Sequence, residues 1–287
     1  MRGASARGAD HVFGALRRDG LGLAARGRYK GGDPRRSMCM TDRLTTARGR
    51  HIAYHRTEGQ GAGIVFLGGF RSDMTGTKAV FLENWAKRQG RPFLRFDYSG
   101  HGASSGDFLD GCIGDWFEDA LDAVTALTAG PQVLVGSSMG GWISLLTARA
   151  VPERVTGFVG IAPAPDFTED SMWDAFTPEE RQRLMETGRV EQPSDYSPEP
   201  YVITRRLIED GRTRLVLRDP LSLPFPVRLL QGTADTDVPP AVALRLMEHA
   251  DCPDLRLTLV KGADHRFSTP ECLAMIAASA AELADAG

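Results

Sequence analysis

The sequence predicts an α/β protein with a mostly parallel sheet, helices on both faces of that sheet, and a helical cap inserted late in the chain. Short apolar runs alternate with amphipathic stretches from about residue 50 to residue 285, which is the pattern of parallel strands joined by helices. The alternation is interrupted over residues 163–222, which are rich in proline, and resumes after them, so we expect an insertion there. The 42% hydrophobic and 25% charged residues are ordinary for a globular protein.

The expected strands are short apolar runs that stop at small or acidic residues. The run 64–67 ends at Gly68-Gly69, and the run 92–96 ends at Asp97, as strands buried on both faces do. The run 51–56 has mixed polarity, so we expect it at an edge of the sheet. The full set of expected strands is 51–56, 64–67, 92–96, 132–135, 155–161, 227–230 and 255–260.

The expected helices have apolar residues at a spacing of three to four positions. Between 77 and 89, for example, Val80, Phe81, Trp85 and Ala86 share one face. The helices expected around the sheet are 77–89, 115–129, 142–150, 240–250 and 270–284. Within the insertion, the pieces 178–187 and 201–210 are also expected to be helical. Apolar residues of this segment could hold the apolar chain of a ligand, and packing of the cap against the core is the alternative for each of them: Phe167, Met172, Trp173, Phe176 and Met185.

The first forty residues differ from the rest of the chain. They hold eight arginines and one lysine against three aspartates, whereas the whole chain has a net charge of −3. We therefore expect residues 1–44 to be a basic, disordered tail or a misassigned start, and residues 45–287 to form one domain with its cap at about 163–222. An organelle transit peptide and a basic binding arm are the alternatives for the tail. We expect a cytoplasmic protein, or a mitochondrial-matrix protein if the tail is a transit peptide.

Composition and residue spacing argue against several classes of binding partner. A mildly acidic net charge argues against a nucleic-acid partner. The longest uncharged run, 123–148, is interrupted by glycines and a proline, so no integral membrane segment is expected. Cysteines at no CxxC spacing predict free thiols, with neither a metal site nor a disulfide framework. Those cysteines are Cys39, Cys112, Cys252 and Cys272. We expect no cofactor, and the oligomeric state stays open.

The sharpest motif is Gly136-Ser137-Ser138-Met139-Gly140, which matches G-x-S-x-G with Ser138 at its centre. An apolar strand precedes it and a helix rich in small residues follows it, which is the context in which this motif presents a nucleophile. A serine at such a strand-to-helix turn occupies a strained backbone position above the sheet edge. The alternative is a plain turn rich in glycine and serine that only joins two elements.

A serine hydroxyl needs a general base, and that base needs an orienting acid. The expected strand 227–230 is followed by Asp235, and the expected strand 255–260 is followed by His265. Because the carboxyl ends of parallel strands meet at one edge of a sheet, we expect Ser138, Asp235 and His265 to converge there. Asp237 is the alternative acid, and Asp264 is interpreted as a loop-capping carboxylate.

Acyl transfer also needs donors for the oxyanion that forms on the substrate. The backbone N–H after the nucleophile belongs to Met139. The second donor should come from the loop after the early buried strand, and we assign it to the Phe70 N–H. His101 lies in a glycine-rich loop, and we interpret it as structural rather than as a base.

With these motifs in place, the sequence resembles the α/β-hydrolase superfamily over about residues 45–285. The motifs occur in the family order: Gly68-Gly69-Phe70, Asp97-x-x-Gly100-x-Gly102, the turn at Ser138, Asp235 before Val238-Pro239, and Asp264-His265. The segments 72–79, 95–100 and 135–142 are further similar to the abhydrolase-domain group of mitochondrial palmitoyl-protein thioesterases and acyl-glucuronide esterases and their bacterial relatives. The chain departs from that group at Gln231, where many relatives have histidine.

The resemblance implies an α/β-hydrolase fold and a serine hydrolase that acts on acyl thioesters or carboxyl esters, small or attached to a protein. It implies a triad of Ser138, Asp235 and His265, and it does not carry over the substrate, because the insertion shapes the pocket. A hydrolase of C–C bonds or of small aromatic esters is the alternative within enzymes. A catalytically silent binding protein on the same fold is the alternative from another class.

Overall fold

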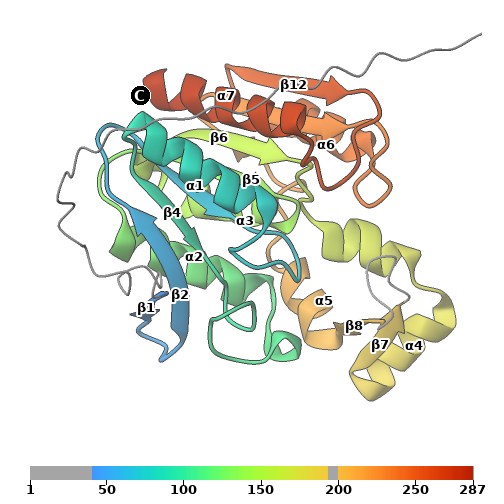
Figure 1. Ribbon diagram of the computed structural model, residues 1–287. Helices are drawn as coiled ribbons and strands as arrows, with labels where there is room; N and C mark the ends of the chain where they lie inside the picture. The colour runs from blue at the N-terminus through green and yellow to red at the C-terminus, as the bar shows by residue number, and fades with distance from the viewer. Residues whose placement is uncertain (1–40, 193–199, 287) are drawn as a thin grey trace, which may run out of the picture. The chain divides into compact units, whose positions relative to one another are not determined.

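The computed structural model describes residues 41–192 and 200–286, and its centre is a twisted eight-stranded sheet (Figure 1). In spatial order the strands are β1 (Asp42–Thr45), β2 (His51–Thr57), β4 (Phe93–Phe96), β3 (Gly63–Leu67), β5 (Gln132–Ser137), β6 (Val155–Ile161), β10 (Val227–Gly232) and β12 (Leu255–Val260). Strands from β4 to β12 pair in parallel, whereas β2 is antiparallel to both of its neighbours. The expected mostly parallel sheet is therefore confirmed.

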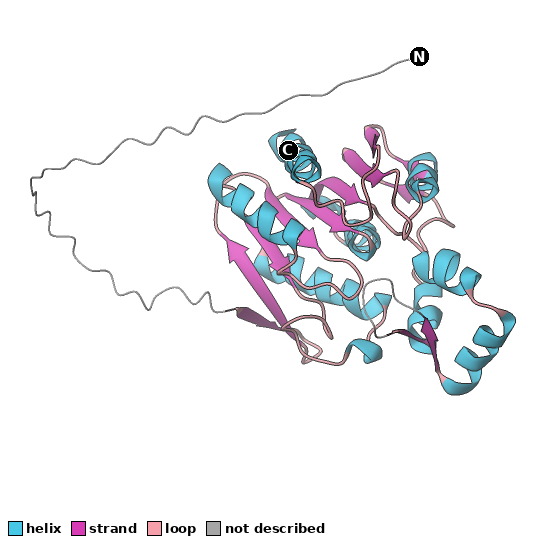
Figure 2. Cartoon of the chain, turned by 45° about the vertical axis from the view of Figure 1, so that its right-hand side comes forward, coloured by secondary structure: helices cyan, strands magenta, loops and turns pink. Residues whose placement is uncertain are grey.

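Helices cover both faces of the sheet (Figures 1 and 2). On one face α1 (Thr77–Gln89) and α7 (Pro270–Ala286) pack over a continuous apolar cluster. On the other face α2 (Ile113–Leu127), α3 (Met139–Ala150) and α6 (Pro240–His249) pack over a second cluster. Two short 3₁₀ turns, η1 (Phe108–Asp110) and η2 (Pro152–Arg154), complete the connections.

Strand β3 is apolar throughout because both of its faces are covered. In β3, Ile64 and Phe66 join the cluster under α1 and α7, while Val65 and Leu67 join the cluster on the other side. Successive side chains of a strand point to opposite faces, so a strand between two helical layers needs apolar residues at every position. This is the physical reason why β3 could be located from a run of hydrophobic residues.

The insertion forms a cap built from short elements. They are the π-helical η3 (Thr168–Trp173), α4 (Pro178–Thr187), β7 (Arg189–Gln192), β8 (Tyr201–Thr204), α5 (Arg205–Arg212) and β9 (Leu221–Ser222), which pairs with β11 (Ala250–Asp251). The two ends of the cap are joined by the buried carboxylate of Asp166, which accepts hydrogen bonds from the Val216 and Leu217 N–H groups at 2.8 and 3.0 Å. Arg218 completes this junction with an ion pair to Asp166 at 3.2 Å.

Two predictions of local structure are corrected. Residues 201–210 were expected to be one helix, but they form β8 followed by α5, because β8 pairs with β7 in an antiparallel ribbon. The Thr204 hydroxyl then caps α5 by accepting from the Leu207 N–H at 3.2 Å. Residues 51–56 were expected at the edge of the sheet, but β1 pairs outside β2 and takes that position. The predicted domain boundary between residues 44 and 45 falls inside β1.

Two further expectations concern the ends of the chain and the membrane. The basic segment 1–40 lies outside the described residues, and so does Cys39. Among the residues that the structure describes, none belongs to a helix that is both long and apolar enough to cross a bilayer. Cys112, Cys252 and Cys272 are free thiols, as expected.

Candidate active site

Ser138 lies in the sharp turn between β5 and α3, with φ of 54° and ψ of −119°. A positive φ is unusual for a residue with a side chain, so the backbone is strained at this position. The turn is possible because two glycines let chain segments approach closely. A Cβ on Gly140 would lie 2.1 Å from the Leu67 carbonyl oxygen, and a Cβ on Gly136 would lie 2.3 Å from the Gly140 carbonyl oxygen. These distances explain both glycines of the G-x-S-x-G motif.

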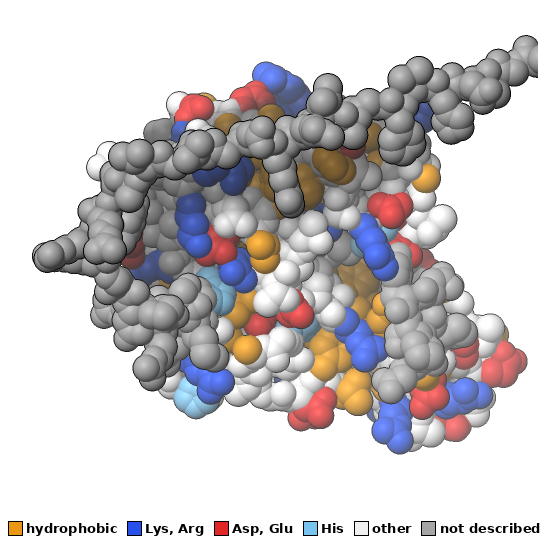
Figure 3. All heavy atoms as spheres, viewed as in Figure 1, with side chains coloured by type: hydrophobic (Ala, Val, Ile, Leu, Met, Phe, Trp, Pro, Cys, Tyr) orange, Lys and Arg blue, Asp and Glu red, His pale blue; other side chains and the backbone are white. Residues whose placement is uncertain are grey.

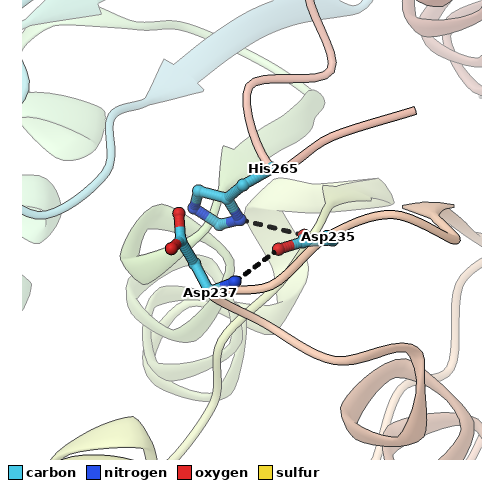
Figure 4. Close-up of side chains that lie close together, drawn as sticks. All are labelled: Asp235, Asp237 and His265. Carbon is cyan, nitrogen blue, oxygen red and sulfur yellow. Dashed lines mark hydrogen bonds and ion pairs between the residues drawn. The ribbon is translucent and has the colours of Figure 1, made fainter. Parts of the chain in front are cut away.

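His265 lies between Ser138 and Asp235. Its Nε2 atom is 3.2 Å from Ser138 Oγ, and its Nδ1 atom is 2.9 Å from Asp235 Oδ2. A carboxylate oxygen only accepts, so the proton is on Nδ1 and Nε2 is left to accept from the serine hydroxyl. Figure 4 shows the imidazole next to the Asp235 carboxylate. The structure thus brings together the three side chains that the sequence singled out.

Asp235 is buried and fully hydrogen-bonded. Its Oδ1 accepts from the Asp237 and Val238 N–H groups at 3.0 and 2.8 Å, and its Oδ2 accepts from Gln231 Nε2 and from His265. Burial alone would raise the pKa of this carboxyl group, but the hydrogen bonds from His265 and Val238 outweigh burial and hold the pKa below its usual value. Asp235 is therefore a carboxylate at neutral pH. The alternative acid, Asp237, is exposed, and it contributes its backbone N–H to Asp235 (Figure 4).

Gln231 donates a hydrogen bond to the Asp235 carboxylate, a contact that the sequence did not reveal. It is completely buried at the end of β10, and its Nε2 donates to Asp235 Oδ2 and to the Val238 carbonyl, both at 2.9 Å. The amide therefore ties the acid to the turn that follows it. Its Oε1 atom has no hydrogen-bond partner within residues 41–192 and 200–286. The one feature of the sequence that drew attention to this position was that Gln231 stands where many relatives have histidine.

The loop after β3 lies against the nucleophile. A Cβ on Gly69 would be 3.4 Å from the Cβ of Ser138, so the backbone of Gly69 lies close to the serine, and Phe70 lines the same cavity as Ser138. The Phe70 ring is held by Phe108 and Trp116, at centroid distances of 4.9 and 5.9 Å. In the described part of the chain the Phe70 N–H donates to no other group. It is therefore available to a ligand beside Ser138.

A cavity of about 690 Å³ opens above Ser138 and His265. The cap contributes Phe167, Met172 and Tyr201 to its wall. Of the five cap residues considered for an acyl chain, only Phe167 and Met172 line this cavity. Trp173 instead packs under the Arg212 guanidinium, 4.2 Å from its ring centroid, Phe176 is buried, and Met185 is 43% exposed. In Figure 3, apolar side chains are visible between the sheet and the cap, with basic side chains beside them.

One set of side chains in the described residues has the composition of a metal site. Ligand atoms of Asp235, Asp237 and His265 lie within 4.8 Å of one another. Both oxygens of Asp235 already accept two hydrogen bonds each, and both nitrogens of His265 are engaged. A cation bound here would displace the hydrogen bond from His265, so the geometry suits proton transfer better than metal binding.

Comparison with known proteins identifies the family to which this chain belongs. Residues 64–286 match the alpha/beta hydrolase family, and the chain belongs to that family. It is a hydrolase, with its triad-like cluster at the carboxyl ends of the strands, where members of open α/β folds place their sites. The expected fold class and the resemblance seen in the sequence are confirmed.

Particular relatives are closely similar. The chain is 38% identical over 218 residues to the mitochondrial palmitoyl-protein thioesterase ABHD10 of Rattus norvegicus, covering 75% of this chain and 73% of that protein. Identity to ABHD10 of Homo sapiens is 35%, covering 76% and 71%. Among solved structures, a hydrolase from Agrobacterium vitis S4 is 42% identical with a TM-score of 0.82, covering 85% of this chain and 98% of that one. Mouse ABHD10 is 34% identical with a TM-score of 0.81, covering 86% and 99%.

Proposed function

We propose that this protein is a serine hydrolase that cleaves acyl thioesters or carboxyl esters through an acyl-enzyme intermediate. One observation carries the proposal: Ser138 Oγ, the His265 imidazole and the Asp235 carboxylate form a continuous hydrogen-bonded chain with contacts of 3.2 and 2.9 Å. Ser138 and His265 also line a cavity large enough for a substrate. The relatives named palmitoyl-protein thioesterase support the thioester class.

Acylation begins when Ser138 Oγ attacks the carbonyl carbon of the substrate. His265 Nε2 accepts the hydroxyl proton, and the resulting imidazolium is stabilised by Asp235. The low pKa of Asp235 matters here, because only the carboxylate form can hold the proton on Nδ1 and offset the new positive charge. His265 then donates the proton from Nε2 to the leaving thiolate or alkoxide.

Two backbone N–H groups are the proposed oxyanion donors. Met139 is the first residue of α3, so its N–H points out of the amino end of a helix, where negative charge is favoured. Phe70 supplies the second N–H from the loop beside Ser138. Each such donor contributes about 10²- to 10³-fold in rate.

Deacylation repeats the same chemistry with water as the nucleophile. His265 accepts a proton from water, the hydroxide attacks the acyl carbonyl, and the proton returns to Ser138 Oγ as the acid product leaves. No cofactor enters these steps. The substrate's acyl part is proposed to lie against Phe167 and Met172, which line the cavity from the cap.

A fluorophosphonate probe tests this function directly, because it modifies only an activated serine. We expect stoichiometric labelling of the wild type and none of Ser138→Ala, with Ser144→Ala as the matched control, since Ser144 is a buried helical serine whose hydroxyl donates to the Gly140 carbonyl. An intact protein that is not labelled would favour the silent binding protein. A panel of acyl thioesters and p-nitrophenyl esters of increasing chain length separates the proposed substrates from small aromatic esters.

The extent of the domain and the location of the protein are further proposals. We propose that residues 45–287, extended by the strand that starts at Asp42, form the hydrolase domain with its cap at about 163–222. For the location, the mitochondrial names of the curated relatives agree with the transit-peptide alternative, and the comparisons lend no support to the cytoplasm. Fusing residues 1–44 to a fluorescent protein, in a eukaryotic cell, tests whether this segment directs import.

A further inference from the structure

A second histidine, His101, is buried next to the proposed oxyanion loop. Its side chain belongs to the loop after β4 and is surrounded by aromatic rings, with centroid distances of 5.6 Å to Tyr98, 5.0 Å to Phe108 and 5.2 Å to Trp116. The residue is only 4% exposed. A buried imidazole in an apolar cage needs partners for both ring nitrogens, so the identity of those partners indicates what it does.

Both ring nitrogens have backbone partners, and together they define the tautomer. The Arg71 N–H donates to His101 Nε2 at 3.3 Å, so that nitrogen carries no proton. Nδ1 lies 3.2 Å from the Ser99 carbonyl oxygen and must therefore carry the proton. Burial, together with the nearby Arg71 charge, lowers the pKa of His101, which favours this neutral form. His101 is therefore a fixed hydrogen-bond acceptor aimed at one backbone N–H.

The N–H that it binds belongs to a strained turn. Gly69–Ser72 form a β-turn closed by the Ser72 N–H and hydroxyl, which donate to the Gly69 carbonyl at 3.2 and 2.8 Å. The third residue of this turn, Arg71, has φ of 56°. Turns with a positive φ at this position ordinarily use glycine or asparagine there, because other side chains disfavour it. The alternative turn rotates the peptide between Phe70 and Arg71, which would aim the Arg71 N–H away from its acceptor.

Phe70, the proposed oxyanion donor, is the second residue of the same turn. Its ring packs on Phe108 and Trp116, the same two rings that surround His101. The side chain of Phe70 is thus anchored by this aromatic cluster, and its backbone is fixed on one side by the turn. A rotation of the Phe70–Arg71 peptide would change ψ of Phe70 and turn its carbonyl oxygen. Because the Phe70 ring is held by Phe108 and Trp116, the rest of the Phe70 backbone, including its N–H, would have to shift to accommodate this rotation.

We propose that His101 is a positioning residue: by accepting from the Arg71 N–H, it holds the turn 69–72 in the strained form that presents the Phe70 N–H to the substrate carbonyl. This inference rests on the proposed function, since it assigns Phe70 to the oxyanion. Within the described part of the chain, His101 is not among the residues that line the cavity above Ser138, so it acts through the turn. Its contribution is to the transition state, so losing it lowers kcat more than it raises KM.

The test compares variants that keep or remove the acceptor. His101→Phe keeps an aromatic ring in the cage but has no acceptor, and we expect kcat for a neutral p-nitrophenyl ester to fall by about 10- to 100-fold with little change in KM. His101→Gln places a carbonyl oxygen near the position of Nε2, and we expect it to restore most of kcat. His101→Leu replaces His101→Phe if the latter does not fold, with circular dichroism and thermal unfolding as the check.

A double-mutant cycle with Arg71→Gly adds a control that only the positioning role predicts. Glycine adopts positive φ without strain, so in the Arg71→Gly background the turn should form without its acceptor. We expect His101→Phe to lower kcat by less than threefold in that background. The inhibition constant of a trifluoromethyl ketone, which forms a tetrahedral oxyanion on serine, should rise in parallel with the fall in kcat.

Three outcomes would overturn the inference: a folded His101→Phe enzyme with kcat within threefold of the wild type, an equal loss in both backgrounds, or a loss that appears only in KM. These outcomes count against the inference only when the wild type, measured alongside, hydrolyses the ester and is labelled by the fluorophosphonate probe. A wild type that is inert to both would instead contradict the proposed function.

Discussion

Replacing Asp235 by asparagine should disable the enzyme through the geometry of its hydrogen bonds rather than through its fold. Two backbone N–H groups, from Asp237 and Val238, donate to Oδ1, so the asparagine oxygen must take that position. The asparagine NH₂ then occupies the place of Oδ2, where it faces two donors, Gln231 Nε2 and His265 Nδ1. His265 can relieve this clash only by moving its proton to Nε2, and in that tautomer it cannot accept from Ser138.

The magnitude follows from this tautomer change. Fixing the wrong tautomer in a serine triad lowers kcat by about 10⁴-fold, which corresponds to about 5.5 kcal/mol of transition-state free energy. We expect a loss of this order in kcat/KM for a p-nitrophenyl ester, with thermal unfolding close to that of the wild type. Asp237→Asn is the matched control because it keeps the backbone N–H that donates to Asp235, and its effect should stay within about fivefold.

The reverse result would refute this reasoning. If Asp235→Asn hydrolysed the ester within tenfold of the wild type while Asp237→Asn lost activity, the acid would be Asp237. If both variants lost activity equally, neither carboxylate could be assigned as the one that orients His265. The same two variants should also differ in fluorophosphonate labelling, because labelling depends on an activated Ser138.

Three further predictions concern strain, charge and close packing. Ser138→Gly should abolish hydrolysis yet raise the free energy of unfolding by about 1 kcal/mol, because glycine removes the strain at φ of 54°; an unchanged or lower Tm would contradict it. Lys78 donates to the Arg266 carbonyl, and its pKa is lowered to about 8, mainly by burial. Above pH 8 the unfolded protein therefore binds more protons at this lysine than the folded protein does. The wild type should therefore gain stability relative to Lys78→Met between pH 8 and pH 10, on the order of 1 kcal/mol in denaturant titrations, and a relative loss would exclude this. Gly140→Ala should remove esterase activity and destabilise the fold by about 1–3 kcal/mol in thermal unfolding, since its Cβ would overlap the Leu67 carbonyl; an active, stable variant would disprove the close approach.

The central sheet and the proposed site could be predicted from sequence because both depend on local patterns. The strand at 155–161 and the helix at 77–89 were located correctly, since a strand covered on both faces is mostly apolar and α1 has apolar residues at helical spacing. Of the predicted face of α1 only Ala86 is fully buried, and Ala79 and Leu82 are buried with it. The positions of Ser138 and His265 follow from the ends of strands. Their convergence needs no information beyond the rule that parallel strands share one carboxyl edge.

What could not be predicted depends on contacts between distant segments. In the helix expected at 115–129, the apolar spacing predicts a buried stripe of Phe117, Leu121, Val124 and Leu127. The structure buries the last two in α2, but it buries Trp116 and Ala120 more completely than Phe117 and Leu121, and the Trp116 indole N–H donates to the Ser99 carbonyl. The helix is apolar on more than one side, so its periodicity did not decide which side faces the sheet. His101 was interpreted as structural, but its hydrogen bond from the Arg71 N–H could not be predicted for a related reason, because the sequence does not show which distant groups meet its ring nitrogens.

The junction at Asp166 has a consequence for how this protein can change its substrates over evolution. Asp166 lies near the start of the insertion, and its carboxylate accepts hydrogen bonds from Val216 and Leu217 near the end. The segment between them is therefore a closed loop whose ends stay together. For a closed loop, doubling its length adds only about 0.6 kcal/mol of entropic penalty. The segment can therefore lengthen, shorten or be replaced while the reacting groups keep their mutual distances, so that selection acts on recognition and on chemistry separately.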